Sequence, residues 1–258
     1  MLGNLSPLAK IENILSKIHS STIKFDKLLP VNIDVKSKLE PKTYLLQVGK
    51  KEMTTKSAID LEVGKQYWGV MKEDTKMKSL SLSQLLEKPH LLQSKKNLVP
   101  NMNLQKLEQV LSSPNPKETM KFGLLEKMAN ASSKQEFMTL SNMLQAVNEN
   151  VFTTLLTHDN KETLFQFKKR KPKEGEEEKV EDVKMDFYAA FEHLGPIEGV
   201  IEIIDGQRKL SLYLYYENSM KFLEEELKSL DIEGFLYKKK GKITPLYEYG
   251  ESLLDLKG

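Results

Sequence analysis

The chain has 258 residues, of which 39% are hydrophobic and 29% are charged, and this size allows about two modest domains. Its 39 basic and 37 acidic residues nearly cancel to a formal net charge of +2. A net charge this small does not create an overall positive field that would attract nucleic acid or an anionic membrane. Cysteine is absent, which excludes disulfides, thiol nucleophiles and cysteine-held metal clusters and fits a reducing cytoplasm.

The N-terminal part, residues 1–74, predicts one helix followed by a small β-barrel-like domain. Ser6-Pro7 is a typical helix start, and apolar residues at helical spacing extend the helix to about His19. Short strands then follow, separated by turn residues, at 31–35, 44–48, 51–55 and 67–71. A closed or half-closed barrel is favoured because closure removes exposed strand edges. We expect a soluble protein without a cleavable export signal, because no apolar run reaches the about 18 residues of a membrane span.

Three aromatic residues of this region, Tyr44, Tyr67 and Trp68, have two interpretations. On a small barrel they can stack nucleobases, although Tyr67 and Trp68 are neighbours and must point to opposite faces of a strand. Packing in the domain core is the favoured interpretation.

The middle of the chain divides into a linker and a helical segment. Residues 75–102 contain Pro89 and Pro100 and predict a linker with one short helical piece at Leu82 to Glu87. Residues 103–158 return to helical spacing, with a break at Pro114-Asn115-Pro116, and predict two or three helices. The methionines of this segment suit an ordinary core or, as the alternative, an adaptable groove for a partner helix; they are Met120, Met128, Met138 and Met143.

Residues 159–258 predict an α+β domain that contains a small sheet covered by one helix. A strand begins at Leu164 and leads into a charged segment, residues 168–182, that is basic from Lys168 to Lys173 and acidic thereafter. Such a segment favours a solvated loop, with a regulatory or docking loop as the alternative. Two strands follow on either side of the Leu194-Gly195-Pro196 break, and a third alternates from Leu210 to Tyr216, leaving its tyrosines Tyr213 and Tyr215 on one face.

The turn and helix of this domain carry their own expectations. The segment Asp205-Gly206-Gln207-Arg208 predicts a hairpin loop of about three to five residues, with positive φ at Gly206. Asn218 or Ser219 then caps a helix that ends at Gly234. One stripe of this helix is apolar and consists of Met220, Leu223, Leu227 and Leu230. As a whole, the chain is predicted to be of the α+β class.

The residue patterns needed for common enzyme sites are absent. His19, His90, His158 and His193 lie too far apart in the chain for a helical pair of metal ligands. Glycine-rich phosphate loops and a Gly-x-Ser-x-Gly elbow are also missing. We therefore expect no catalytic residue, no metal and no cofactor.

The C-terminal pattern resembles the C-terminal domain of the flagellar hook-length control family. The resemblance rests on Leu194-Gly195 followed by alternating aliphatic residues to Ile203, on the strand Leu210 to Tyr216, and on a leucine-containing helix before Ile232-Glu233-Gly234. It covers about the last third of the chain.

This resemblance implies a non-enzymatic bacterial component of the flagellar type III export system. Such a protein would be cytoplasmic or, as the alternative, would itself be exported through the flagellar apparatus. Its partner would be the cytoplasmic domain of the export-gate switch protein, and its task would be hook-length control or the switch of substrate specificity. The residues carried over as candidate partner-binding residues are Leu194, Gly195, Ile197, Val200 and Ile201, as the framework of the domain. The alternative hypothesis is a single-stranded nucleic-acid-binding protein that uses the small barrel and the cluster Lys168 to Lys173.

Overall fold

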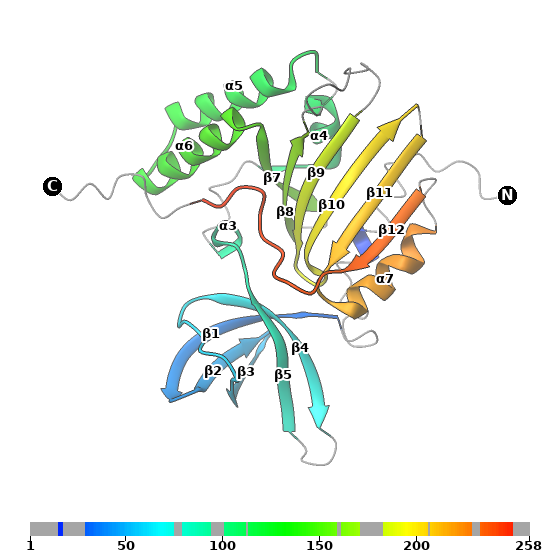
Figure 1. Cartoon of the computed structure of the whole chain (residues 1–258). Coiled ribbons are helices and arrows are strands. Elements are labelled where there is room, and N and C mark those ends of the chain that lie inside the picture. Colours follow the sequence, from blue (N-terminus) through cyan, green and yellow to red (C-terminus); the bar gives the residue numbers. More distant parts are fainter. Residues whose placement is uncertain are drawn as a thin grey trace.

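The computed structural model describes residues 15–17, 29–74, 79–93, 101–111, 113–158, 161–170, 183–205, 207–228 and 233–249. Its strands form a five-stranded sheet and a seven-stranded sheet. Figure 1 shows the five-stranded sheet below the larger one, with helices α5 and α6 beside the larger sheet. The predicted α+β class is confirmed. Of the predicted N-terminal helix, only Leu15–Lys17 lie within the described residues, and they are helical.

The five-stranded sheet has the strand order β3-β2-β1-β4-β5. Its members are β1 (Val31–Glu40), β2 (Thr43–Val48), β3 (Lys51–Lys56), β4 (Gln66–Asp74) and β5 (Ser79–Glu87). Alternate residues of β1 and β2 are buried in an N-terminal core that contains Ile33, Val35, Tyr44, Leu46, Leu61 and Tyr67. Since β3 and β5 end this order and no pairing joins them in the described part of the chain, the predicted closure into a barrel is wrong.

The last strand of this sheet, β5, occupies the predicted linker. The helical piece expected at Leu82 to Glu87 is wrong, because these residues pair with β4. Serines and leucines alternate from Ser79 to Ser83, and this period of two is the signal of a strand. Near the end of β5 the register shifts and Gln84 takes a φ of 54°, which indicates a β-bulge. The short helix α3 (His90–Gln93) follows.

The middle segment is helical up to residue 148. It contains β6 (Asn101–Met102), α4 (Leu104–Leu111), α5 (Pro116–Ala129) and α6 (Lys134–Asn148). The hydroxyl of Ser133 accepts a hydrogen bond from the backbone N–H of Glu136 and so caps α6. The expectation of helix up to residue 158 is wrong, because Asn150 has a φ of 64° and the β-branched run that follows forms β7 (Val151–His158).

The seven-stranded sheet has the order β12-β11-β10-β9-β8-β7-β6. It includes β8 (Lys161–Lys169), β9 (Val183–Phe191), β10 (Gly195–Ile204), β11 (Gln207–Leu214) and β12 (Glu233–Lys238). Neighbours from β7 to β11 are antiparallel, whereas β12 is parallel to β11 and is reached through helix α7 (Glu217–Leu227). The three strands expected around Leu194-Gly195 and Asp205 are therefore confirmed, in a larger sheet than expected.

Two local expectations about this domain are corrected. Ile204 pairs with Gln207, so the hairpin turn has only two residues; Asp205 has a φ of 49°, and Gly206 lies outside the described residues. Helix α7 begins after Tyr216 without a side-chain cap and its last residue is Leu227, whereas Gly234 belongs to β12. The predicted stripe of Met220, Leu223 and Leu227 does pack on the sheet; Leu230 lies outside the described residues.

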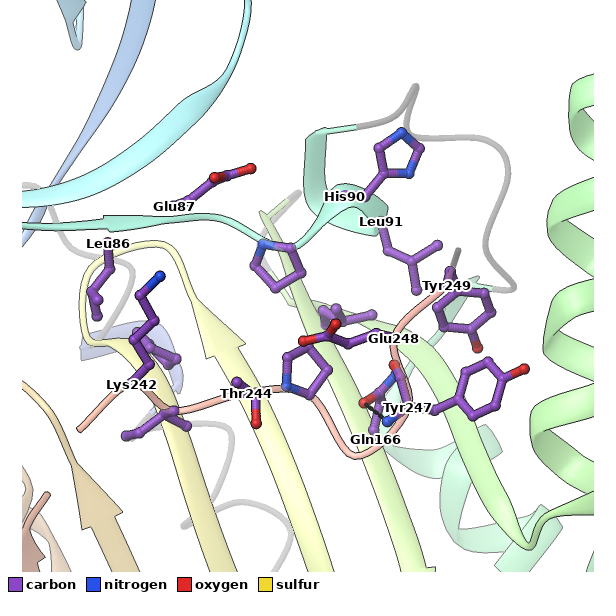
Figure 2. Close-up of a pocket in the computed structure, with 15 residues that line it drawn as sticks. Leu86, Glu87, His90, Leu91, Gln166, Lys242, Thr244, Tyr247, Glu248 and Tyr249 are labelled. Atoms are coloured by element: carbon purple, nitrogen blue, oxygen red, sulfur yellow. Dashed lines mark hydrogen bonds between the residues drawn. The ribbon is translucent and has the colours of Figure 1, made fainter. Parts of the chain in front are cut away.

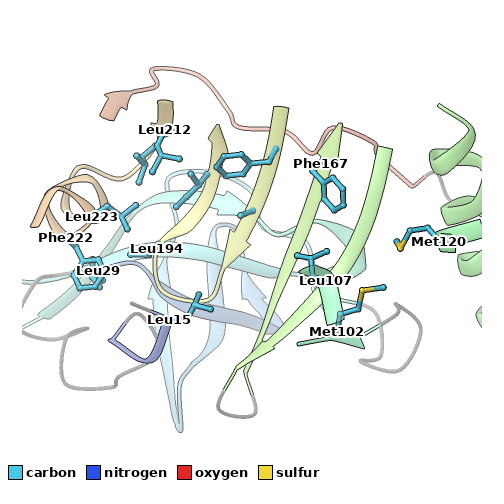
Figure 3. Close-up of a cluster of buried hydrophobic side chains, with 14 residues drawn as sticks. Leu15, Leu29, Met102, Leu107, Met120, Phe167, Leu194, Leu212, Phe222 and Leu223 are labelled. Carbon is cyan, nitrogen blue, oxygen red and sulfur yellow. The ribbon is translucent and has the colours of Figure 1, made fainter. Parts of the chain in front are cut away.

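The two faces of the seven-stranded sheet belong to different cores. Figure 3 shows the α7-side core, in which Phe222 and Leu223 of α7 lie near Leu29, Leu15 and Leu194. Leu107, Met102 and Phe167 extend this core toward β6 and α4. The opposite face of the seven-stranded sheet belongs to the strap-side core, named after the C-terminal strap, residues 239–249. This core joins the seven-stranded sheet to α5 and α6, to the five-stranded sheet and to the strap. Its members include Leu140, Met143, Leu164, Tyr188, Trp68 and Ile243.

The two sheets meet at a small set of buried side chains. The indole N–H of Trp68 in β4 donates to the carbonyl oxygen of Phe191 in β9 at 2.9 Å. The hydroxyl of Tyr216 donates to the carbonyl oxygen of Gln84, at the bulge in β5, at 3.0 Å. Both rings are about 1% exposed. The Tyr216 ring packs against Gly195, where an added Cβ would lie 2.5 Å from a ring carbon.

Replacement of Gly195 with valine should lower the free energy of unfolding by about 3 kcal/mol. Gly195 has a φ of 76°, which costs a β-branched residue about 1–2 kcal/mol, and the new side chain collides with Tyr216. Urea denaturation measures the difference. Gly123→Ala is the matched control, because an added Cβ meets nothing within 4 Å there and alanine favours helix, so this variant should be slightly stabilised. Equal stability of Gly195→Val and the wild type would contradict the packing described.

Lys88 makes the stability of the junction depend on pH. Burial lowers the pKa of Lys88 from 10.5 to about 8, against the opposing attraction of Glu192 and Asp34, while its amine lies 5.5 Å from the Trp68 ring centre. The unfolded chain therefore holds a proton that the folded chain lacks between about pH 8 and 10.5. The free energy of unfolding therefore rises with pH between about pH 8 and 10.5, and this gain is lost as the pH falls to about 8.

Lys88→Met should remove this dependence. The variant should unfold at higher urea concentration than the wild type at pH 7, by up to about 3 kcal/mol, since it buries no charge. The advantage should shrink toward pH 10. Denaturation curves at pH 7, 9 and 10 check both statements, and parallel pH profiles of the two proteins would refute the assignment.

Candidate protein-interaction surface

One half of the seven-stranded sheet presents a face to solvent on the side away from α7. The inward residues of β11, Leu210, Leu212 and Leu214, join the α7-side core. Their neighbours point the other way, so the exposed side of β9 to β12 forms three cross-strand rows. The first two rows are Lys184, Glu202, Lys209, Glu233 and Asp186, Val200, Ser211, Phe235. The third row, Glu198, Tyr213, Tyr237, begins at β10, because Tyr188 of β9 is about 1% exposed and belongs to the strap-side core. We call this surface the open face.

Aromatic side chains gather on the open face at its outer strands. The rings of Tyr213 and Tyr237 are stacked with their centres 5.1 Å apart. Phe235 lies one row away, and the amine of Lys209 sits 4.8 Å from its ring centre. Tyr237 is 44% exposed. A stacked pair beside a third ring provides rigid apolar area of the kind that is enriched in protein interfaces.

Charged residues lie beside these rings, mainly on β9 and β10, and mostly compensate one another. Arg170 binds Asp186 through both carboxylate oxygens at 2.9 and 2.8 Å, and this contact raises the pKa of the guanidinium. Lys184 lies 3.7 Å from Glu202, and Lys239 forms an ion pair with Glu198. The open face therefore combines an aromatic group on its outer strands, β11 and β12, with charged pairs that compensate one another on and beside β9 and β10.

The five residues proposed from the sequence are mostly framework. Leu194 and Ile197 are about 1–2% exposed, and Gly195 is buried against Tyr216. Val200 is half-buried on the open face, while the half-buried Ile201 belongs to the α7 side. Of the five, only Val200 is placed where a partner can touch the open face.

The aromatic residues of β12 were missed at the sequence level. Helix α7 was expected to run to Gly234, which left Phe235 and Tyr237 without a strand. The alternation of Phe235, Leu236 and Tyr237 was the available signal, but β12 has only six residues. Its parallel pairing with β11 is a tertiary contact that short-range spacing does not reveal.

The three aromatic residues that suggested nucleic-acid binding are buried in the structure. Tyr44, Tyr67 and Trp68 are 0%, 5% and 1% exposed, so their interpretation as core residues is confirmed. Bases cannot stack on rings that are buried in this way. Arg170 is paired with Asp186, and residues 171–173 of the basic cluster lie outside the described residues.

A cavity of about 340 Å³ lies between the end of β5, helix α3 and the C-terminal strap. Figure 2 shows Glu87, His90 and Lys242 apart from one another around it, whereas Gln166 contacts the strap at Tyr247. The amide of Gln166 accepts from the Tyr247 N–H at 3.3 Å and donates to the Tyr247 carbonyl at 3.0 Å. These two bonds attach the strap to β8.

The same polar group continues into the sheet. Gln166 also donates to the hydroxyl of Thr153 at 3.2 Å, and this oxygen lies 2.8 Å from the Tyr249 hydroxyl. Gln166 and Thr153 are about 0–2% exposed, so the network satisfies buried polar groups. The polar residues at this border of the cavity therefore hold the strap on the sheet.

The described ranges also bear on metal sites and membrane spans. There, no group of three or more His, Cys, Asp or Glu side chains is placed to hold a metal ion. His193 is 2% exposed and its Nε2 lies 3.4 Å from Glu192, whose other carboxylate oxygen accepts from Asn32 at 2.6 Å. Within those ranges no helix combines the length and apolar character of a membrane span.

Comparison with known proteins adds no assignment to this geometry. No protein-family model, no curated protein and no solved structure gives a significant match to the chain.

Proposed function

We propose that the chain is a non-enzymatic protein-interaction protein of the flagellar type III export system. In this proposal its C-terminal domain binds the cytoplasmic domain of the export-gate switch protein and takes part in hook-length control or substrate-specificity switching, with the cytoplasm as its place of action. The observation that carries the proposal is the open face, a solvent-facing aromatic surface built by the segment that resembles the hook-length control family.

Two features support an interaction role for this segment. The Leu194-Gly195 motif serves the framework, since it is buried and positions Tyr216 at the junction of the sheets. The strands that follow it leave Tyr213, Phe235 and Tyr237 on the open face, beside charged pairs that compensate one another. Interfaces depend on a few such aromatic anchors surrounded by weaker polar contacts.

The double variant Tyr213→Ala/Tyr237→Ala should weaken binding of the purified export-gate cytoplasmic domain by about ten-fold or more, because it removes both stacked anchors. Isothermal titration calorimetry with the full chain measures the dissociation constant. The control is Phe122→Ala on α5, which removes a ring that is 71% exposed outside the open face and should leave the affinity unchanged.

Absence of binding by the wild-type chain would refute the proposed partner. Equal loss of binding in the double variant and in Phe122→Ala would refute the open face as the contact surface. Circular dichroism of each variant separates these outcomes from unfolding.

A further inference from the structure

The outer edge of β12 differs from the other sheet edges of this protein. Natural proteins protect edge strands with charges, bulges or very short length, because unpaired backbone groups attract further strands. The edge strand β3 carries Lys51, Glu52 and Lys56 among its six residues. The edge strand β5 has the bulge at Gln84, and β6 has only two residues. Each of these three edges shows a protecting feature.

Strand β12 has no such feature in its centre. Its sequence is Glu233-Gly-Phe-Leu-Tyr-Lys238, with charges only at the two ends and four uncharged residues between them. Gly234 is exposed, although Leu227 of α7 packs over one side of it. Among the described residues, no strand pairs with the outer edge of β12. A groove of about 610 Å³ lies between α7 and β12 and is lined by Met220, Leu227, Leu236 and others. An additional strand therefore has both backbone groups to pair with and a groove for a side chain.

The order of residues along β12 identifies the strand that fits. Consider a second β12 placed antiparallel beside the first, with Leu236 opposite Leu236 of the second copy. Phe235 then faces Tyr237 of the second copy, and Glu233 faces its Lys239. Lys239 is positioned to continue the strand, since its N–H donates to the carbonyl oxygen of Leu214 at 2.8 Å.

This register gives compatible side-chain neighbours on both faces of the joined sheet. On the open face, two Glu233–Lys239 pairs flank two Phe235–Tyr237 pairs, and opposite-charge and aromatic pairs are favourable cross-strand neighbours. The first row of the open face already alternates in charge from Lys184 to Glu233, so the Lys239 of the second copy continues it. On the α7 side, Lys238 of the second copy faces Gly234 and lies next to the Leu227 side chain that packs over this glycine.

We propose that the chain forms a two-fold symmetric dimer through antiparallel pairing of its β12 edges. The interface is isologous, as in most homodimers, because the same strand is used on both sides. It joins the two seven-stranded sheets into one continuous sheet and brings the two aromatic groups of the open faces together. The proposal is independent of the flagellar assignment, since it rests only on the edge, the groove and the charge order.

Charge reversal at the two ends of the strand tests this register. In a Glu233→Lys homodimer, a lysine at residue 233 of each copy faces Lys239 of the other, which gives two like-charge pairs. In a Lys239→Glu homodimer, a glutamate at residue 239 faces Glu233, and the variant also loses the ion pair of Lys239 with Glu198 in its own chain. Sedimentation velocity from low to high micromolar concentration should show a self-associating wild type. Each single variant should self-associate at least about ten-fold more weakly.

An equimolar mixture of the two variants supplies the decisive result. In the heterodimer, lysine faces glutamate at both ends, so the mixture should sediment as a dimer although neither component does alone. Circular dichroism of each variant verifies folding, and Lys51→Glu on the protected edge β3 is the matched control that should leave the association unchanged.

A wild type that remains monomeric throughout the concentration range would overturn the proposal. A dimer that persists in both single variants would also overturn it, by placing the contact elsewhere. Both results leave binding of the export-gate domain to the open face as a separate question, which the Tyr213 and Tyr237 variants address.

Discussion

The contact of Tyr216 with Gly195 is the constraint on which the arrangement of the two sheets depends. The ring occupies the space that any side chain at residue 195 would need, and its hydroxyl reaches the backbone at the bulge of β5. Trp68 makes the corresponding contact from the other sheet, by donating to the backbone of β9. Because these hydrogen bonds lie within an apolar core, breaking either one would leave a buried polar group without its partner. Tight packing and the hydrogen bonding of buried polar groups thus act together at the junction.

The junction also contains groups that do not favour stability. Lys88 is buried with a depressed pKa and is attracted by Glu192, which in turn contacts Asn32 and His193. A core of apolar residues alone would avoid the cost of burying this charge. The buried charge therefore makes the contact between the sheets less stable at neutral pH than an apolar substitute would.

The sequence predicted elements with strong local signals and missed those that depend on distant pairing. The strands around Leu194-Gly195 and the helix with Met220 and Leu223 were accessible from spacing and turn chemistry, whereas positive φ was expected at Gly206 and not at Gly195. Strand β5 was missed because its serines resembled a linker, and β12 because it follows a helix and has only six residues. The barrel was expected from the need to remove edges, but charges on β3 and a bulge in β5 provide another solution. The open face could be anticipated only in part, since Tyr213 was placed on the outer face of its strand while its stacking partner Tyr237 was not recognised.

The long separation between Trp68 and its acceptor has a consequence for how the chain matures on the ribosome. Strands β1 to β5 end at Glu87, and their pairings are local, so this lobe can assemble as soon as they emerge. The carbonyl that receives the indole N–H belongs to Phe191 and is synthesised much later. Until then the lobe presents an unpaired tryptophan edge to its surroundings, and the nascent chain has a built-in interval during which that edge is open to chaperones or to premature association.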